Sequence, residues 1–339
     1  MRNEYDDRYI IRLANKGDIN DIMSFIDTHW KKGHIMATDH ALFEYEFLED
    51  DGTVNFVIAI DRKKGKIEGL NGFLKASHDK AHLDIWGSIW KVVDGCKGML
   101  GAEIIKRRAF LTQCRCDLDV GSNPRTAIPV MKHLLKHYTA KMNHYYMLAD
   151  REDYKIAKVI HKREPMKRNT DGKVIRFNDM NSLRKYFNSQ RFIDSIPYKD
   201  DWYIGHRFFD YPIYKYEVYG IINNEKAEGI IVLRRQNLNG RIAIRVVDYI
   251  GNPKVISSAG NFFYQLLDNQ DVEYIDFYCH GFNNDAISEA GFILLDENDE
   301  NIIPNYFSPF LQENIEIWVD SAKPNSLFSK ADADQDRPN

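Results

Sequence analysis

Val120-Gly121-Ser122-Asn123 recurs 160 residues further along the chain as His280-Gly281-Phe282-Asn283. A period of this length is too long for a solenoid repeat, so the match suggests two copies of a whole domain. Single short matches arise by chance, but a set of them in one order at similar separations indicates a repeat. The further matches, at separations of 164, 160 and 154 residues, are Ile11-Arg12-Leu13 with Ile175-Arg176-Phe177, Glu68-Gly69 with Glu228-Gly229, and Val92-Val93-Asp94 with Val246-Val247-Asp248.

The size and composition of the chain agree with two domains. It has 339 residues, 44% of them apolar, and a formal net charge of −4. Domains commonly contain about 100–200 residues, so this chain has enough apolar side chains for two cores. The composition predicts a soluble globular protein without a general affinity for nucleic acid. The N-terminus has no apolar signal segment, so we expect a cytoplasmic protein without membrane insertion.

Several kinds of site are excluded by the spacing of reactive residues. The histidines show no His-Glu-x-x-His sequence, so no metal site is expected. There is no Gly-x-Ser-x-Gly sequence, so a covalent acyl-enzyme has no evident nucleophile. The four cysteines contain no Cys-x-x-Cys pair and are interpreted as reduced packing residues; they are Cys96, Cys114, Cys116 and Cys279.

A basic stretch from Lys155 to Lys173 separates the two copies. It is either a solvated linker or a surface that binds phosphate groups. With this boundary, the first domain is expected at residues 1–160 and the second at 172–325. Residues 326–339 form a C-terminal tail, of which the charged part, Asp332–Asn339, is expected to fray.

Hydrophobic periodicity predicts a similar order of elements in each copy. In the first copy, strands are expected near 9–13, 55–60, 67–74, 83–93, 115–120 and 144–148, and helices near 19–30, 39–48, 102–110 and 126–138. In the second, strands are expected near 174–177, 216–222, 229–233, 242–248, 274–278 and 316–319, and helices near 181–187, 255–267 and 284–290. The predicted class is α/β (α+β), with two pseudo-symmetric domains that each contain a mixed sheet flanked by helices.

The glycine-bearing turn before the helix at 102–110 carries the clearest chemical signal. A helix that begins after such a turn presents unpaired backbone N–H groups and the positive end of its dipole, which suits pyrophosphate. The turn is equally compatible with a simple tight connection between strand and helix. The residues that would bind the anion are Lys97, Gly98, Met99, Leu100, Gly101 and Ala102.

This turn, at its place after the fourth strand, resembles the GNAT acyl-CoA N-acyltransferase fold, here in tandem. More specifically, five further stretches resemble bacterial tandem-GNAT enzymes that acylate nucleotide-linked amino sugars. They are Trp30-Lys31-Lys32-Gly33-His34-Ile35, Phe43-Glu44-Tyr45, Ile67-Glu68-Gly69, Trp86-Gly87-Ser88-Ile89-Trp90 and His144-Tyr145-Tyr146-Met147-Leu148. The resemblance continues through Ile303-Pro304-Asn305-Tyr306-Phe307 to the C-terminus.

The resemblance implies transfer of an acyl group, which can be a 3-hydroxyacyl group, from coenzyme A to the amine of a dTDP-3-amino-3,6-dideoxyhexose. Such a reaction serves the synthesis of bacterial surface polysaccharide. The family turn reads Arg/Gln-x-x-Gly-x-Gly/Ala, and this chain has Gly95 and Leu100 at its outer positions. The corresponding stretch of the second copy contains Pro253, which lacks an amide donor. CoA is therefore assigned to the first copy, and the sugar nucleotide to a site between the two copies that the second copy helps to form.

The resemblance also implies the catalytic groups. The sugar amine would attack the thioester directly while a backbone amide of the fourth strand, which includes Val92, polarises the carbonyl oxygen. His34 and Asp94 are the two candidate bases. Asp94 can instead cap the turn, and His34 can instead contact the sugar. Asn123 stands where these folds hold the pantetheine arm, and it can equally cap the following helix.

Aromatic and polar side chains are the candidates for binding the nucleotide sugar, because a ring can stack on a base and arginine can pair with pyrophosphate. Core packing is an alternative role for Trp202 and Tyr306. The candidates are Trp30, Trp90, Trp202, Arg207, Asn283, Asn305 and Tyr306. A monomer or weak dimer is expected.

Two other functions remain open. A tandem-GNAT aminoacyl transferase that uses aminoacyl-tRNA would employ the basic stretch and would show salt-sensitive binding of tRNA. A protein that binds CoA or a sugar nucleotide without catalysis would retain an imperfect turn such as the one at Gly98.

Overall fold

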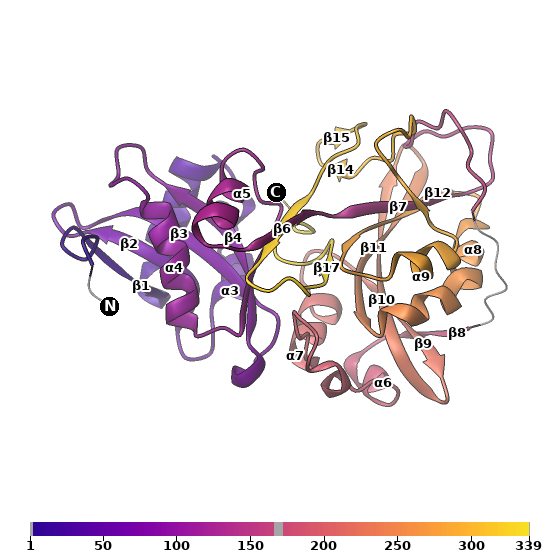
Figure 1. The fold of residues 1–339 in the computed structure, drawn as a ribbon, viewed down its shortest axis with the longest axis horizontal. Coiled ribbons are helices and arrows are strands. Elements are labelled where there is room, and N and C mark those ends of the chain that lie inside the picture. Colours follow the sequence, from indigo (N-terminus) through magenta and orange to yellow (C-terminus); the bar gives the residue numbers. More distant parts are fainter. Residues whose placement is uncertain (1–2, 166–171, 339) are drawn as a thin grey trace. The chain divides into compact units, whose positions relative to one another are not determined.

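The computed structural model describes residues 3–165 and 172–338 of the chain (Figure 1). The chain divides into two compact units. The first contains Met1–Thr139, Asp320–Pro324 and Arg337–Asn339, and the second contains Ala140–Val319 and Asn325–Asp336. The domain boundaries expected at residues 160, 172 and 325 stay a prediction.

The first unit is built on a seven-stranded sheet in the order β1-β2-β3-β4-β5-β16-β6. The pairs from β1 to β4 are antiparallel, whereas β4 and β5 are parallel. The strands are β1 (Tyr9–Asn15), β2 (Thr53–Asp61), β3 (Lys66–Lys75), β4 (Asp84–Val92), β5 (Cys116–Val120), β6 (Tyr138–Lys141) and β16 (Trp318–Ser321). The helices are α1 (Ile19–Phe25), α2 (Ile35–Thr38), α3 (His40–Phe47), α4 (Leu100–Thr112) and α5 (Ala127–Pro129), with π-helical segments at Ile26–Trp30 and Val130–Leu134.

Helices pack on both faces of this sheet, as the alternation of side chains in β2 requires. Val57 and Ala59 face α4 and form a core with Leu100 and Ile104. Phe56 points to the opposite face, where its ring stacks on Phe43 of α3 at a centroid distance of 5.6 Å. Asp39 caps α3 by accepting a hydrogen bond from the N–H of Leu42, which confirms the predicted start of this helix.

The second unit is built on an eight-stranded sheet in the order β13-β7-β12-β11-β10-β9-β8, with β17 on β12. Here β11 and β12 are parallel, and β8 to β11 pair antiparallel. The strands are β7 (Asn143–Leu148), β8 (Lys173–Phe177), β9 (Glu217–Asn223), β10 (Lys226–Leu238), β11 (Arg241–Gly251), β12 (Val272–His280), β13 (Ile293–Leu294), the separate hairpin β14 (Tyr306–Phe307) with β15 (Phe310–Leu311), and β17 (Phe328–Ser329). The helices are α6 (Met180–Arg184), α7 (Asp201–Ile204), α8 (Gly260–Leu267) and α9 (Asn284–Glu289), with a 3₁₀ segment at Pro253–Ala259 and a π-helical segment at Gly205–Phe209.

The two faces of this sheet differ in character. On one face, Ile244 and Phe277 belong to a large apolar core that includes Phe263 of α8 and Ile287 of α9. The opposite face carries charged residues that are nearly excluded from water, among them Arg245, which is 2% exposed. Such groups need partners, because a buried charge without one is costly.

Two of the four sequence matches coincide in the structure. The match of Ile11 with Ile175 is one residue out of register, because Ile11 and Gly69 both pair with Ala59, whereas Val174 is the residue that shares its partner, Ile221, with Gly229. Gly121 and Gly281 both follow a strand with φ near 80°, at 79° and 82°, and the next asparagine of each copy caps a helical segment. Gly69 and Gly229 also correspond. A Cβ on Gly69 would lie 2.7 Å from Ile104 of α4, and one on Gly229 would lie 2.1 Å from the Tyr249 hydroxyl. Both positions need glycine because other side chains approach the strand closely.

The match between Val92-Val93-Asp94 and Val246-Val247-Asp248 was wrong. Gly69 pairs with Val92, whereas its counterpart Gly229 pairs with Gly251. Residue 92 therefore corresponds to residue 251 rather than to residue 246. Alternating apolar residues recur every two positions along a strand, so a short match of this kind fits several registers.

Three other expectations were wrong. The helix expected at 126–138 ends at Leu134, because Lys136 has a left-handed φ of 62° and Tyr138 begins β6. The strand near 144–148 does not complete the first sheet but pairs with β12 in the second. The strand expected near 316–319 forms as β16, which lies beside β5 in the first sheet.

The C-terminal tail is buried rather than frayed. Phe328, Ala331 and Asp332 are each at most 1% exposed. Residues of β17 pair with Cys279 and His280 of β12, and the N–H of Ala331 donates to the carbonyl oxygen of Val247 in β11 at 2.7 Å. Residues 325–336 are called the C-terminal segment below. Because the other edge of β12 pairs with β7, the C-terminal segment lies between β11 and β12.

Candidate functional site

In the first unit, the two parallel strands β4 and β5 separate. Their pairing ends at Gly87 and Asp119, although β4 continues to Val92. Within the described part of the chain, the carboxyl end of β4 therefore has a strand neighbour only on its β3 side. The turn that leads into α4 begins at this end of the strand, so the sheet places the turn beside the gap in the strand pairing.

The turn presents backbone donors, as the sequence predicted. The N–H groups of Gly98, Met99, Gly101 and Ala102 have no acceptor among residues 3–165 and 172–338. Met99 has a left-handed φ of 61° and precedes the first residue of α4, a helix of 13 residues. Unpaired amides at the start of a helix of this length form a site suited to an anion.

The other predicted residues of the turn have structural contacts. The N–H of Leu100 donates to the carbonyl oxygen of Lys97, and the side chain of Leu100 belongs to the core below α4. The N–H of Lys97 donates to the hydroxyl of Tyr9 at 3.0 Å, and the Lys97 ammonium lies 3.0 Å from a carboxylate oxygen of Glu4. Trp90 packs against Gly101, where an added Cβ would lie 3.1 Å from its ring. These contacts fix the geometry of the turn.

The structure also locates the remaining candidates of the first unit. His34 is 4% exposed and caps α2, because its Nδ1 accepts a hydrogen bond from the N–H of Met36. Asp94 lies exposed in the turn, two residues beyond the end of β4. Trp30 is 48% exposed at the end of a π-helical segment. Asn123 accepts hydrogen bonds from the N–H groups of Arg125 and Thr126, which is the capping role.

A buried ion network surrounds the point where β4 and β5 separate. The guanidinium of Arg108, from α4, is fully buried and donates to the carboxylates of Asp117 and Asp119 on β5. Its Nη1 also donates to the side-chain oxygen of Asn71 on β3 at 2.8 Å. Burial alone would lower the pKa of Arg108, but the two carboxylates outweigh it and raise that pKa. The network holds α4 against β3 and β5.

A histidine–aspartate pair that the sequence did not reveal lies at the end of β5. The Nδ1 of His137 is 2.8 Å from Asp320, whose other carboxylate oxygen accepts a hydrogen bond from Ser122 at 3.0 Å. The side chain of His137 is 9% exposed and that of Asp320 is fully buried. With Nδ1 held by a carboxylate, the Nε2 atom remains to accept a proton.

The charges around this pair favour the protonated form of His137. Burial would lower the pKa of His137, but its hydrogen bond to Asp320 and the charges of Asp320, Asp117 and Asp119 outweigh burial and raise that pKa. Burial and the charge of Asp119 raise the pKa of Asp320. Asp119 forms the last pair between β5 and β4. The charges that act on His137 therefore include one that lies at the gap in the strand pairing.

In the second unit, the predicted substrate residues do not form one group. Asn305 contacts Arg245, and Tyr306 lies beside Lys330. Arg207 donates to the carbonyl oxygen of Asp336 at 3.2 Å. Trp202 instead stacks on His206 at a centroid distance of 5.0 Å, and Asn283 caps α9. Three of the predicted residues, Asn305, Tyr306 and Arg207, therefore belong to the charged face of the second sheet. The other two, Trp202 and Asn283, have local roles.

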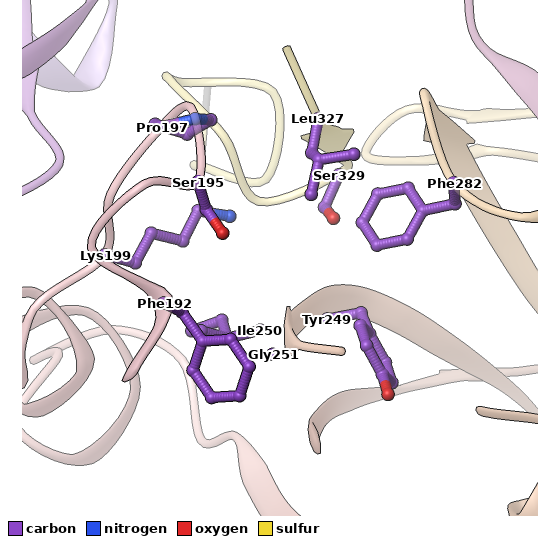
Figure 2. Close-up of a pocket in the computed structure, with 10 residues that line it drawn as sticks. All are labelled: Phe192, Ser195, Pro197, Lys199, Tyr249, Ile250, Gly251, Phe282, Leu327 and Ser329. Atoms are coloured by element: carbon purple, nitrogen blue, oxygen red, sulfur yellow. The ribbon is translucent and has the colours of Figure 1, made fainter. Parts of the chain in front are cut away.

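The second unit also contains a partly open pocket that includes none of the predicted residues. It lies at the carboxyl ends of β11 and β12 beside the C-terminal segment, and encloses about 350 Å³ when the space open to solvent is included. Figure 2 shows three aromatic rings around it and the hydroxyl of Ser329 facing its interior. The lining residues are Phe192, Ser195, Pro197, Lys199, Tyr249, Ile250, Gly251, Phe282, Leu327 and Ser329.

Other expectations concern the surface and the metals. Within residues 3–165 and 172–338, no group of His, Cys, Asp and Glu is arranged to hold a metal ion. The same residues contain no helix that is both long and apolar enough to cross a bilayer. In the basic stretch, Lys162 pairs with Asp150 and Arg163 with Asp296. Lys167 and Arg168 lie outside the described residues.

Comparison with known proteins identifies the fold. No family model and no curated protein matches the sequence significantly. Among solved structures, a GCN5-related N-acetyltransferase from Anabaena variabilis has a TM-score of 0.54 at 9% identity, covering 92% of this chain and 72% of that one. A GCN5-related N-acetyltransferase from Sphaerobacter thermophilus scores 0.41 at 10% identity, covering 96% of this chain and 99% of that one. The N-myristoyltransferase of Saccharomyces cerevisiae with bound myristoyl-CoA scores 0.43 at 8% identity, covering 97% and 83%.

The comparison with the structure from Anabaena variabilis carries the argument about fold. Together with the mixed sheets and their parallel β4–β5 and β11–β12 pairs, it shows that the chain has the GCN5-related N-acetyltransferase (GNAT) fold in two tandem units. This is the fold that the sequence predicted.

Proposed function

We propose that the protein is an acyl-CoA-dependent N-acyltransferase whose acceptor is the amine of a dTDP-linked amino-deoxy sugar. The first unit would bind CoA, and the second would bind the nucleotide sugar. The observation that carries the proposal is the turn at Gly98–Ala102, where four amides without acceptors start a long helix beside the gap in the strand pairing. The sugar acceptor rests on the family resemblance, and polysaccharide synthesis would be the setting of the reaction.

In the proposed reaction the uncharged amine attacks the thioester carbonyl carbon, a C–N bond forms, and the C–S bond breaks. The thiolate leaves with the electron pair, and the proton lost by the amine is taken up by a base and passed to the thiolate or to water. Backbone amides of β4 near Val92 would stabilise the oxyanion. No residue needs to form a covalent intermediate.

His137 is our preferred base, ahead of the candidates His34 and Asp94. A base must be held in one orientation and titrate near the working pH. The Asp320 carboxylate orients the His137 ring through Nδ1, whereas the Nδ1 of His34 already accepts a hydrogen bond from the backbone. Replacing His137 by Gln should lower kcat about 100-fold with little change in KM for acyl-CoA, as expected for loss of general base catalysis.

A conservative change distinguishes this role from a structural one. Asp320→Asn retains the shape of the pair but removes the charge that raises the pKa of His137. The limb of the kcat/KM profile that reports His137 should therefore move to lower pH. An unchanged profile in Asp320→Asn, or full turnover in His137→Gln, would transfer the role to Asp94 or His34, which the variants Asp94→Asn and His34→Gln test in the same assay.

Binding of CoA is tested at Gly98. An added Cβ meets no atom within 4 Å, so Gly98→Val should leave the fold intact while its side chain occupies the space in front of the amides. CoA affinity measured by calorimetry should fall at least tenfold. The control is Phe110→Ala on the same helix, since Phe110 is 60% exposed and lies two turns of the helix beyond Ala102. Equal loss in both variants would contradict the assignment.

Turnover is tested by following free thiol while acetyl-CoA and 3-hydroxyacyl-CoA are offered with dTDP-3-amino-3,6-dideoxyhexoses. Release of thiol that depends on the amino sugar, with an amide product found by mass spectrometry, is the expected result. CoA binding without thiol release across the set of amino sugars would instead support a non-catalytic binding protein.

A further inference from the structure

Lys330, from the C-terminal segment of the second unit, is a buried amine without a partner. It is 4% exposed, and its ammonium forms no hydrogen bond or ion pair with any residue in 3–165 or 172–338. A lysine in this setting is unusual, because a buried charge is normally paired. Burial, as the largest cause, lowers the pKa of Lys330 to about 7.

The charges that face Lys330 are already matched with one another. Arg245 of β11 pairs with Asp276 of β12 at 3.1 Å. Arg234 of β10 pairs with Asp336 of the C-terminal segment at 2.6 Å. These two basic and two acidic groups are the charges that act most strongly on Lys330. The protonated amine is therefore the one charge in this group without a counter-charge.

Two aromatic rings lie near the same amine. Its nitrogen lies 5.8 Å from the ring centre of Tyr278 and 6.0 Å from that of Tyr306. The Tyr306 side chain is 38% exposed, so this side of the group reaches the surface. Asn305 accepts a hydrogen bond from Arg245, and its side-chain nitrogen has no partner. A cation flanked by two rings suits an anionic group attached to a flat or hydroxylated molecule.

The other buried lysine of this unit, Lys199, has a structural role and serves as a comparison. The ammonium of Lys199 lies 2.7 Å from Asp248 and 2.6 Å from Asp332. Burial would lower the pKa of Lys199, but these two carboxylates outweigh burial and raise it. Lys199 therefore fixes the C-terminal segment to β11, whereas Lys330 has no such role to explain its burial.

We propose that the Lys330 ammonium binds a phosphate group of a ligand held by the second unit, between the rings of Tyr278 and Tyr306. The choice of a nucleotide diphosphate as the source of that phosphate rests on the proposed function. The anion would supply the missing counter-charge, and by favouring the protonated amine it would raise the pKa of Lys330.

The test uses thymidine diphosphate, inorganic pyrophosphate and uncharged thymidine as probes, with calorimetry at pH 8 in buffers of different ionisation enthalpy. Because the free amine is mostly neutral at this pH, binding of either anion should take up close to one proton. Lys330→Met should abolish this uptake and weaken binding about 10- to 100-fold, which is typical for loss of a charged hydrogen bond. The matched control Lys185→Met removes an exposed lysine of the same unit and should change neither quantity.

The outcomes separate the hypotheses. Tighter binding of thymidine diphosphate than of pyrophosphate would indicate a nucleotide, and equal binding would indicate a general phosphate site; both support the proposal. Undiminished binding in Lys330→Met, binding without proton uptake, or no binding by the native protein would overturn it. CoA affinity should be unchanged in Lys330→Met, and diphosphate affinity unchanged in Gly98→Val. Loss of CoA binding therefore bears on the acyltransferase proposal, and loss of diphosphate binding on Lys330.

Discussion

Replacing Lys330 by Met should make the folded protein more stable at neutral pH, although it removes a buried side chain from the second unit. The ordinary pKa of lysine is 10.5, and burial lowers that of Lys330 to about 7, a difference of 3.5 units. Each unit corresponds to about 1.4 kcal/mol, so at pH 7 the native state is disfavoured by about 4 kcal/mol relative to an unperturbed lysine. Methionine has a similar length and carries no charge.

The direction in which stability changes with pH follows from the lowered pKa of Lys330. Between the lowered pKa of the folded state and the ordinary pKa of the unfolded chain, the unfolded chain binds more protons at this position, so stability rises with pH. The penalty is complete below about pH 7 and disappears above about pH 10.5. Lys330→Met should therefore gain about 1–4 kcal/mol at pH 7 and nothing near pH 10.5. The assay is urea unfolding followed by circular dichroism at pH 7, 8.5 and 10.5.

The comparison of native and variant proteins at each pH cancels the titration of all other groups. Loss of the contacts between Lys330 and the two tyrosine rings would act in the opposite direction, but it would act equally at every pH. A variant that is less stable than the native protein by the same amount at pH 7 and at pH 10.5 would refute the reasoning, because it would mean that Lys330 contributes packing or an unseen pairing rather than a penalty.

Three further variants test the buried ion pairs and the C-terminal segment. Lys199→Met should destabilise the protein by about 3–5 kcal/mol at pH 7 in urea unfolding, because two buried carboxylates lose their partner; Asp332→Asn should restore part of this in the double variant. Arg108→Met should cost a similar amount in the same assay, because the buried carboxylates of Asp117 and Asp119 lose their partner. Removal of residues 325–339 should raise amide hydrogen exchange in β11 and β12, and a synthetic peptide of residues 325–336 should reverse the change.

The features that sequence analysis predicted are local ones. Asn123 and Asn283 each follow a strand and a glycine, and each caps a helical segment, because capping depends on residues within the next three positions. The turn at Gly98 was predicted in the same way, since glycine before an amphipathic helix indicates a turn with free amides.

The features that sequence analysis missed depend on contacts between distant residues. His137 and Asp320 are separated by 183 positions, and no local pattern relates them. The C-terminal segment is charged, which is typical of a solvated tail, but its charges pair with Lys199 and Arg234 inside the second unit. Pairing of β7 with β12 likewise joins residues more than a hundred positions apart, and strand partners are not encoded by periodicity.

The two units differ in what lies between their separated parallel strands. This difference supports the proposal that the first unit binds CoA and the second binds the nucleotide sugar. In each unit a parallel strand pair separates before its longer strand ends, at Gly87 and Asp119 in the first and at Val246 and Phe277 in the second. In the second unit β17 pairs with β12 there, and Ala331 binds β11, so the chain itself occupies the place between the strands. In the first unit the same place lies beside amides that lack acceptors. We propose that an extended cofactor arm lies at this place in the first unit, whereas the second unit fills the corresponding place with its own C-terminal segment. The second unit is left with the opposite, charged face of its sheet, where an anionic acceptor would meet Lys330.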